Sequence, residues 1–469
     1  MSKTIANPPP AEAVDYQESG RPQFHFTARR NWLNDPNGLV YCAGEYHLFF
    51  QHNPTDNNWG NMTWGHAVSA DLVTWRQIED AIEPDHLGTI YSGSAVIDHD
   101  NTAGFQTGAE PTIVAMYTAA GGSSPESEGQ PFTQCLAYSN DRGRIWTKYA
   151  RNPVLPHVVG ENRDPKVIWY APGQFWVMAL FLDGESFALF TSPNLKRWNR
   201  IQTLSIPNSS ECPDFFPMTV QGAPDEERWV FAAANSHYLI GRFDGAVFTE
   251  IAGPYAMDFG SNFYAAQTFS DIPPADGRRI QIGWMAGGVY PGMPFNQQMT
   301  FPTEMTLRDT PDGLRVFRSP VSEIALLVTD RSEWRDLSVS PGENPLSEIS
   351  SDLLDIELEV PLDSSAVFGF RIGGREIRYA HQDQTISCLG RVARRESAEP
   401  VMHLRILADR TSLEIFVDGG RSTLSFCVTP ADPRPSLEFF AEGAPVRVSS
   451  LLVRTLRSSW SETSGEFPL

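Results

Sequence analysis

The sequence predicts an all-β protein, with a five-bladed β-propeller followed by a C-terminal β-sandwich. Aromatic residues make up 11% of the 469 residues, and no long stretch has the period of an amphipathic helix. Short apolar segments alternate with turns rich in Gly, Pro, Asn and Asp, as strands do. A two-strand pattern also recurs five times along the chain.

Each copy of this pattern begins with a polar cluster that leads into a strand, followed by a turn and a strongly apolar strand. Spacings of roughly 50 to 70 residues suit propeller blades of four strands. An irregular β-sandwich is the alternative interpretation. The first strands are predicted over 34–41, 91–98, 163–170, 211–218 and 261–269, and their partners begin at Gly44, Pro111, Gly173, Glu227 and Arg278.

The first strand of a propeller blade usually lines the central channel, so equivalent ends of these strands meet at one opening. We therefore expect Asp35, Ser92, Asp164, Glu211 and Asn262 to lie together, although they are far apart in the sequence. This convergence of separate carboxylates is what predicts a functional site.

The polar-cluster pattern stops after about residue 318, which suggests a second domain. We predict an N-terminal tail over 1–20, the propeller over 21–320 and the β-sandwich over 336–469. Alternating strands resume at 354–360 and 411–420, and the Gly-Gly pairs that begin at Gly373 and Gly419 are typical of hairpin turns. This second domain contains no convincing catalytic cluster.

The charge balance excludes some classes of partner. There are 57 acidic and 36 basic residues, and the resulting net charge of -21 repels phosphate backbones and anionic lipid, so we expect neither nucleic acid nor a membrane as partner. The longest apolar run, 175–182, is too short to cross a bilayer. Five scattered cysteines without C-x-x-C spacing argue against a disulfide framework and a structural zinc site.

The N-terminal residues have one lysine and no apolar stretch after it, so they show no secretory signal. We expect a cytoplasmic protein, or a secreted one whose leader has been removed. Self-association through the C-terminal sandwich is left open.

The acidic residues of the repeats suit the hydrolysis of glycosides. This reaction needs one carboxyl group to protonate the leaving oxygen and another to attack the anomeric carbon or activate water. Asp35, Asp164 and Glu211 supply both and leave one to stabilise positive charge on the ring. Arg163 would help keep Asp164 ionised. We expect no metal and no organic cofactor, because the sequence lacks His/Asp ligand spacing.

The segment 21–75, which contains Asn-Asp-Pro-Asn-Gly at 34–38, resembles the start of glycoside hydrolase family 32, the β-fructosidases. Arg-Asp-Pro at 163–165 and Glu-Cys-Pro-Asp at 211–214 follow in the family's order, and Tyr-Ser-Gly-Ser at 91–94 stands where that family commonly has Phe-Ser-Gly-Ser. An Asp-Arg-x-Ser-x-Glu-x-Phe segment at 409–416 extends the resemblance into the sandwich.

The resemblance implies a role for each acid. Asp35 would be the nucleophile, Glu211 the acid/base and Asp164 the transition-state stabiliser, and the configuration would be retained through a covalent fructosyl-enzyme. Sucrose or a fructan, either levan or inulin, is the implied substrate. The implied substrate-binding residues are Asn34, Asn37, Gln51, Trp59, Tyr91, Ser92, Arg163 and Trp284.

These residue types suit a furanose, because a Trp side chain offers a flat apolar wall while amides, hydroxyls and a guanidinium bind sugar hydroxyls. Packing within the blades is the alternative role for Trp59 and Trp284. Many exo-acting family members continue after Gly-Trp-Met with Asn-Trp or a similar pair, whereas here Met285 is followed by 286–288, Ala-Gly-Gly. The preferred leaving sugar is therefore left open.

Three other functions fit parts of the pattern. A pentose-specific propeller glycosidase also uses three acids but inverts configuration. A fructosyltransferase would share the proposed mechanism but pass the sugar to another sugar instead of water. A fructan-binding module or inactive lectin-like propeller would bind without releasing reducing sugar. We expect an enzyme, because all three acids are present.

Overall fold

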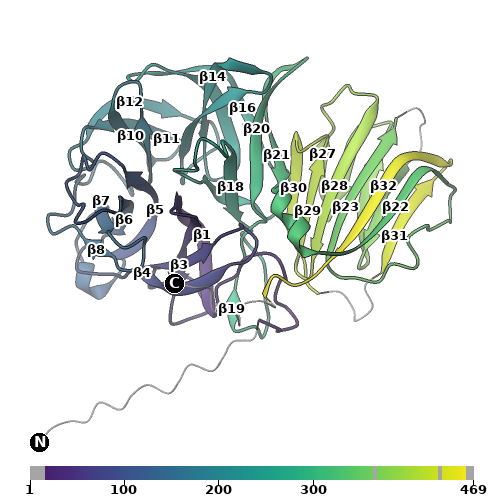
Figure 1. The fold of residues 1–469 in the computed structure, drawn as a ribbon, viewed down its shortest axis with the longest axis horizontal. Coiled ribbons are helices and arrows are strands. Elements are labelled where there is room, and N and C mark those ends of the chain that lie inside the picture. Colours follow the sequence, from purple (N-terminus) through teal and green to yellow (C-terminus); the bar gives the residue numbers. More distant parts are fainter. Residues whose placement is uncertain (1–15, 363–366, 431–435, 461–469) are drawn as a thin grey trace, which may run out of the picture.

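The computed structural model of the chain describes residues 16–362, 367–430 and 436–460, and within these ranges nearly all regular structure is β. Figure 1 shows two bodies side by side, a ring of blades and a two-layered sandwich. The two short 3-10 helices, η1 (Pro125–Ser127) and η2 (Ser322–Leu327), are far shorter than a membrane-spanning helix, and the described part of the chain has no helix that could span one.

The first three blades are four-stranded antiparallel sheets in which strand order follows the sequence. They comprise β1 (Asn31–Cys42), β2 (Glu45–Asn53), β3 (Thr63–Ser69) and β4 (Arg76–Ile82); β5 (Thr89–Asp98), β6 (Thr112–Ala120), β7 (Thr133–Ser139) and β8 (Thr147–Lys148); and β9 (Arg163–Tyr170), β10 (Phe175–Asp183), β11 (Ser186–Ser192) and β12 (Asn199–Ser205). The apolar second strand of each blade lies between two neighbours and is buried nearly throughout.

The fourth and fifth blades are joined at one parallel pair, Val220 with Leu307, so they form a single larger sheet. The fourth blade comprises β13 (Asp214–Val220), β14 (Ala223–Ala232), β15 (His237–Phe243) and β16 (Phe248–Ala256). The fifth comprises β17 (Tyr264–Thr268), β18 (Arg279–Trp284), β20 (Thr303–Thr310) and β21 (Gly313–Pro320).

The innermost strands close a ring, which defines the propeller. β1 contacts β5, β5 contacts β9, β9 contacts β13, β13 contacts β17, and β17 contacts β1. A parallel pairing of β1 with the short strand β19 (Phe295–Asn296) joins the first and last blades. Apolar side chains fill the space between blades, as where Phe49 and Trp64 of the first blade pack with Tyr117 of the second. The five-bladed fold predicted from the repeat is therefore confirmed.

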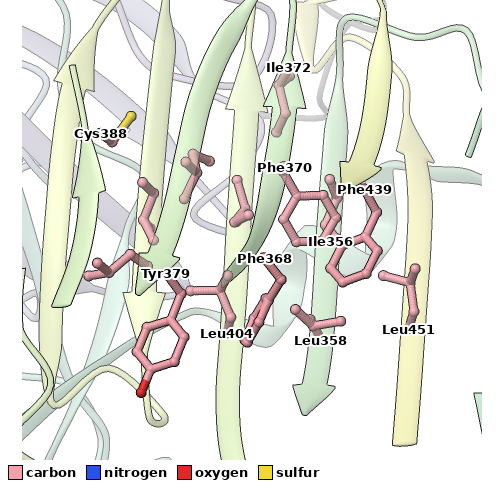
Figure 2. Packing of buried hydrophobic residues seen from close by; sticks show 14 of the residues in the cluster. Ile356, Leu358, Phe368, Phe370, Ile372, Tyr379, Cys388, Leu404, Phe439 and Leu451 are labelled. Carbon is pink, nitrogen blue, oxygen red and sulfur yellow. The ribbon is translucent and has the colours of Figure 1, made fainter. Parts of the chain in front are cut away.

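The second body is a β-sandwich of two antiparallel sheets, as the alternating strands predicted. One sheet has the order β22-β32-β23-β28-β29-β30 and the other β27-β26-β25-β24-β31. Figure 2 shows Phe368, Phe370 and Phe439 of one sheet packing against Ile356 and Leu358 of the other. The strands are β22 (Val328–Val339), β23 (Leu354–Pro361), β24 (Val367–Ile372), β25 (Arg375–Ala380), β26 (Thr385–Cys388), β27 (Arg391–Arg394), β28 (Val401–Asp409), β29 (Ser412–Val417), β30 (Ser422–Cys427), β31 (Leu437–Glu442) and β32 (Val446–Leu456).

The predicted domain boundaries differ from the strands at two places. β22 begins at Val328, ahead of the predicted sandwich start at 336, because its charged and mostly exposed sequence lacks the alternation that marks a strand with one buried face. Within the predicted tail 1–20, Tyr16 is buried and stacks on Trp460 at a centroid distance of 4.4 Å. Residues 1–15 of that tail, and 461–469 of the predicted sandwich, lie outside the described residues.

A buried ionic cluster joins the propeller to the sandwich. His25, which precedes the first blade, places Nδ1 2.9 Å from Asp409 Oδ2 and Nε2 2.7 Å from Glu414 Oε2. Burial alone would lower the pKa of His25, but the hydrogen bonds and charges of the two carboxylates raise it to about 9. His25 is therefore charged at neutral pH and bonded to both acids of the sandwich motif at 409–416.

This cluster makes stability depend on pH. Because the folded pKa of His25 lies above its ordinary value of 6.5, its contribution is fully present below pH 6.5 and is lost as the pH rises through about 9. His25→Gln removes the charge and leaves two buried carboxylates, so we expect it to lower the free energy of unfolding at pH 6 by about 3–5 kcal/mol. Denaturant unfolding between pH 6 and 9.5 measures this, and an unchanged pH slope in the variant would contradict it.

Candidate active site

Three carboxylates from three blades lie together at the ends of inner strands. Asp35 belongs to β1, Asp164 to β9, and Glu211 lies three residues before β13. The thiol of Cys212 lies between two of them, because its Sγ is 3.5 Å from Asp35 Oδ2 and 3.5 Å from Asp164 Oδ2. Burial raises the pKa of this thiol, so it stays protonated and can donate to a carboxylate.

Asp35 accepts hydrogen bonds at both oxygens. Ser92 Oγ donates to Oδ2 at 2.5 Å, and Asn34 Nδ2 donates to Oδ1 at 3.0 Å. Asn34 is held in turn by Trp32, whose Nε1 donates to its Oδ1 at 2.8 Å. Burial raises the pKa of Asp35 and the negative charge of Glu211 adds to this, while the hydrogen bonds oppose it. The carboxylate is thus fixed in direction and short of full solvation.

Asp164 is almost completely buried, and its pKa is raised to about 7. Burial is the largest cause, and the charges of Asp35 and Glu211 add to it. Arg163 lowers the pKa, as expected from the sequence, but its Nε lies 3.9 Å from Asp164 Oδ2 and does not outweigh burial. The backbone N–H of Cys212 donates to the same oxygen at 3.0 Å.

Glu211 accepts one hydrogen bond at each oxygen. Arg163 donates to Oε1 at 2.6 Å, and the hydroxyl of Tyr264 donates to Oε2. The guanidinium of Arg163 also lies over the ring of Phe181, 4.8 Å from its centroid, which fixes its plane. Two donors from neighbouring blades therefore fix the orientation of the Glu211 carboxylate, and its side chain stays 29% exposed.

The backbone is strained where two of the acids lie. Asp164, Glu211 and Cys212 have φ angles of 64°, 60° and 39°, in the left-handed region that residues with a Cβ seldom adopt. Such conformations persist only where the surroundings fix them, and they gather at functional sites. Here the N–H of Asp164 donates to Thr118 Oγ1 at 3.0 Å, and the carbonyl of Glu211 accepts from Ala234 N at 3.1 Å.

The other predicted binding residues surround the acids at two levels. Asn34, Ser92 and Arg163 bond directly to a catalytic candidate. Asn37 and Gln51 lie behind them. The side-chain amide of Asn37 is oriented so that its oxygen faces donors and its nitrogen faces acceptors. In this orientation its oxygen accepts from Gln51 Nε2 at 3.0 Å and its nitrogen donates to Ser92 Oγ at 3.2 Å.

The aromatic candidates form two edge-to-face groups. Trp59 and Tyr91 have ring centroids 5.9 Å apart, and Trp59 is 55% exposed, so its indole face is free to contact a ligand. Trp284 packs edge-to-face with Trp32 at 6.2 Å and with Tyr264 at 6.3 Å, and its Nε1 donates to Gln297 Oε1 at 3.1 Å.

The expected position of Asn262 among the acids is wrong. Its Nδ2 donates to Ala286 O at 2.6 Å and its Oδ1 accepts from Cys427 N at 2.9 Å, so its amide faces the sandwich. Tyr264, two residues later, contacts Glu211 instead. Sequence reasoning missed Tyr264 because it begins an apolar strand, and it missed Cys212, whose place directly after Glu211 was the available signal. Among the described residues, no three His, Cys, Asp or Glu side chains are grouped to hold a metal ion.

Comparison with known proteins supports the resemblance to glycoside hydrolase family 32 that the sequence shows. The family descriptions "Glycosyl hydrolases family 32 N-terminal domain" and "Glycosyl hydrolases family 32 C terminal" match residues 25–320 and 323–455. A levanase of Bacillus subtilis (strain 168) is 39% identical over an alignment that covers 97% of this chain and 73% of the levanase. An extracellular exo-inulinase of Aspergillus awamori is 28% identical over 96% of this chain and 97% of its own length.

Solved structures show the same fold. The crystal structure of exo-inulinase from Aspergillus awamori has a TM-score of 0.85 at 27% identity, covering 95% of this chain and 100% of that one. A fructofuranosidase from Schwanniomyces occidentalis, complexed with fructose, has a TM-score of 0.82 at 25% identity, with 95% and 100% covered.

The fold is a closed ring of blades, and three of the blades carry carboxylates to one site. Together with these relatives, this defines a glycoside hydrolase of the β-fructofuranosidase type. The chain belongs to glycoside hydrolase family 32, as the sequence resemblance predicted.

The raised pKa of Asp164 gives a spectroscopic prediction. Its carboxyl group should be protonated at pH 5 and ionised at pH 9, with a midpoint near 7. Infrared difference spectra should contain a carboxylic C=O band that titrates at this midpoint and is absent in Asp164→Asn. Asp100→Asn, which changes an exposed carboxyl, is the control and should leave the band unchanged. A band that survives in Asp164→Asn belongs to another group.

Proposed function

We propose that this protein is a retaining β-fructosidase that hydrolyses fructosyl linkages in sucrose or in fructans. The observation that carries the proposal is that Asp35 and Asp164 both contact the thiol of Cys212, while Arg163 bonds to Glu211 and lies beside Asp164. A retaining glycosidase needs a nucleophile and an acid/base close together, and this arrangement supplies two carboxylates with different hydrogen-bonding environments and a third beside them.

In the first step, Asp35 attacks the anomeric carbon of the fructosyl unit while the bond from that carbon to the leaving oxygen breaks. Glu211 gives its proton to that oxygen, and a fructosyl ester of Asp35 remains. The two hydrogen bonds on Asp35 hold one carboxylate in line with its target. This step releases glucose from sucrose or a shortened chain from a fructan.

In the second step, Glu211 takes a proton from water and the water oxygen attacks the anomeric carbon, which returns Asp35 to the carboxylate. Two attacks on the same carbon retain its configuration. Asp164 binds ring hydroxyls and stabilises the positive charge that develops on the ring in both transition states. Its ionised form does this best, so we expect activity to fall as the pH drops below about 7.

The substrate class follows from the side chains around the acids and from the relatives. Exposed Trp59 offers an apolar wall, while Asn34, Ser92 and Arg163 place polar groups directly beside the acids, where they suit sugar hydroxyls. The relatives are a levanase and an exo-inulinase, and the fructofuranosidase neighbour holds fructose. Membership of family 32 disfavours the pentose-specific alternative.

The test is to incubate the protein with sucrose, inulin and levan, and to follow the products by chain length and by NMR. We expect fructose released first as the β-anomer from at least one substrate. Fructose alone means exo-action, shorter oligomers mean endo-action, and products longer than the substrate mean transfer to a sugar. First release of the α-anomer would contradict retention, and binding without release would contradict an enzyme.

Azide separates the roles of the two acids. Glu211→Ala should lower kcat on sucrose by about 10²–10⁴-fold. On an aryl β-fructofuranoside, whose leaving group needs little protonation, azide should partly restore the rate by attacking the fructosyl ester, giving a β-fructosyl azide. Asp35→Ala cannot form that ester, so any azide product should have the opposite configuration. NMR of the azides measures this. Equal configurations from both variants would contradict the assignment, and thermal midpoints show whether each variant is folded.

A further inference from the structure

The sandwich pairs with a segment of the propeller along its edge strand, β30. β30 is the last strand of its sheet, and its free edge would expose unpaired backbone groups. Residues 257–262 of the propeller cover this edge. Thr423 N donates to Met257 O at 3.2 Å, Phe259 N donates to Thr423 O at 2.8 Å, and Asn262 N donates to Ser425 O at 3.0 Å. The segment that leads into β17 is thus paired with the sandwich.

A buried carboxylate reinforces this pairing. Asp258, with a side chain only 2% exposed, accepts from Thr423 Oγ1 at 2.8 Å and from Ser425 Oγ at 2.7 Å. The cation of Arg318 lies 3.8 Å from the same carboxylate. A buried carboxylate without such donors would be strongly unfavourable, so the two hydroxyls of β30 fix where the propeller segment lies.

The two backbones approach as closely as side chains allow. A Cβ on Gly260 would lie 2.2 Å from Ser425 O and 2.3 Å from Ser425 N, so only glycine fits at this position. Asn262 then bonds to Cys427 at the end of β30. Two residues further, Tyr264 begins β17 and donates its hydroxyl to Glu211. The path from β30 to the acid/base candidate is therefore short and continuous.

A second path joins the sandwich to the same wall of the site. Thr411 Oγ1 donates to Gln298 Oε1 at 2.7 Å, and Met285 N donates to Gln298 O at 3.0 Å. Met285 follows Trp284, which packs edge-to-face with Tyr264 and is its cross-strand partner. Tyr264, which contacts Glu211, and its neighbour Trp284 thus both lie beside segments anchored in the sandwich.

We propose that the sandwich is a positioning part of the active site: through Thr423 and Ser425 it holds Tyr264 against Glu211. Tyr264 and the two β30 hydroxyls are positioning residues, because they act through Glu211 rather than on the substrate. This inference rests on the proposed function, in which Glu211 protonates the leaving oxygen. It assigns the second domain a part in proton transfer in addition to its part in stability.

The test uses the full-length protein and two substrates, sucrose and an aryl β-fructofuranoside whose leaving group needs little protonation. The double variant Thr423→Val with Ser425→Ala removes both hydroxyls that bond to Asp258. We expect kcat/KM, which reports the steps up to release of the leaving group, to fall about tenfold on sucrose, a fraction of the 10²–10⁴ that a positioned acid supplies, and less than about twofold on the aryl substrate. Tyr264→Phe should show the same selectivity.

A matched control lies at the opposite edge of the same sheet. Thr329 in β22 and Thr455 in β32 form an exposed hydroxyl pair, 2.9 Å apart, with no part in the junction. Thr329→Val with Thr455→Val should leave both rates unchanged. If the double β30 variant does not fold, as judged by thermal midpoint and near-UV circular dichroism, Ser425→Ala alone keeps one hydroxyl and should show the same selectivity with a smaller loss.

Combining the β30 variant with Tyr264→Phe separates positioning from general loosening. If the sandwich acts through Tyr264, the two losses on sucrose should not multiply, since each removes the same alignment of Glu211. Equal losses on both substrates, or losses that multiply in full, would overturn the inference while the function stands. A Glu211→Ala variant with unchanged kcat on sucrose would instead overturn the proposed function.

Discussion

The crowding of three carboxylates in a poorly solvated place is the constraint on which the rest of this site depends. Burial and neighbouring negative charges both disfavour ionisation, and they raise the pKa of Asp35 and Asp164. Each acid has a hydrogen-bond donor that offsets this effect. Ser92 donates to Asp35, the backbone amide of Cys212 donates to Asp164, and Arg163 donates to Glu211. Asp164 is more buried than the other two acids. Chemically identical groups thus have different hydrogen-bond partners.

The propeller meets this constraint because each blade contributes residues to the site, while the stability of the blade depends on packing elsewhere. The blades pack through apolar side chains, so the ends of the inner strands can carry polar groups and unusual backbone angles, as at Asp164 and Glu211. The free-energy cost of these backbone angles is offset by packing elsewhere. Donors and acids then come from different blades, and a shift of one blade against the next would separate partners such as Arg163 and Glu211.

The sequence predicted those parts of the site that are local. The first strand of each blade and the acids near strand ends could be found, because turn residues and apolar runs have a fixed relation to the strand. Contacts that depend on how the fifth blade meets the sandwich could not. Asn262 has the expected position in the repeat, yet the close approach at Gly260 turns it toward the sandwich. The contact of Tyr264 with Glu211 could not be predicted, because an aromatic residue at a strand end usually packs against apolar side chains.

Closure of the ring through β1 and β19 has a consequence for biogenesis. The ribosome makes Asn31 in the first blade well before its partner Phe295, which follows the fourth blade in the chain. Until then the inner strand that holds Asp35 has no neighbour on one side, and Glu211 lacks the tyrosine of the last blade. Incomplete chains are thus expected to be catalytically silent, and enzymatic turnover reports that translation has passed the last blade.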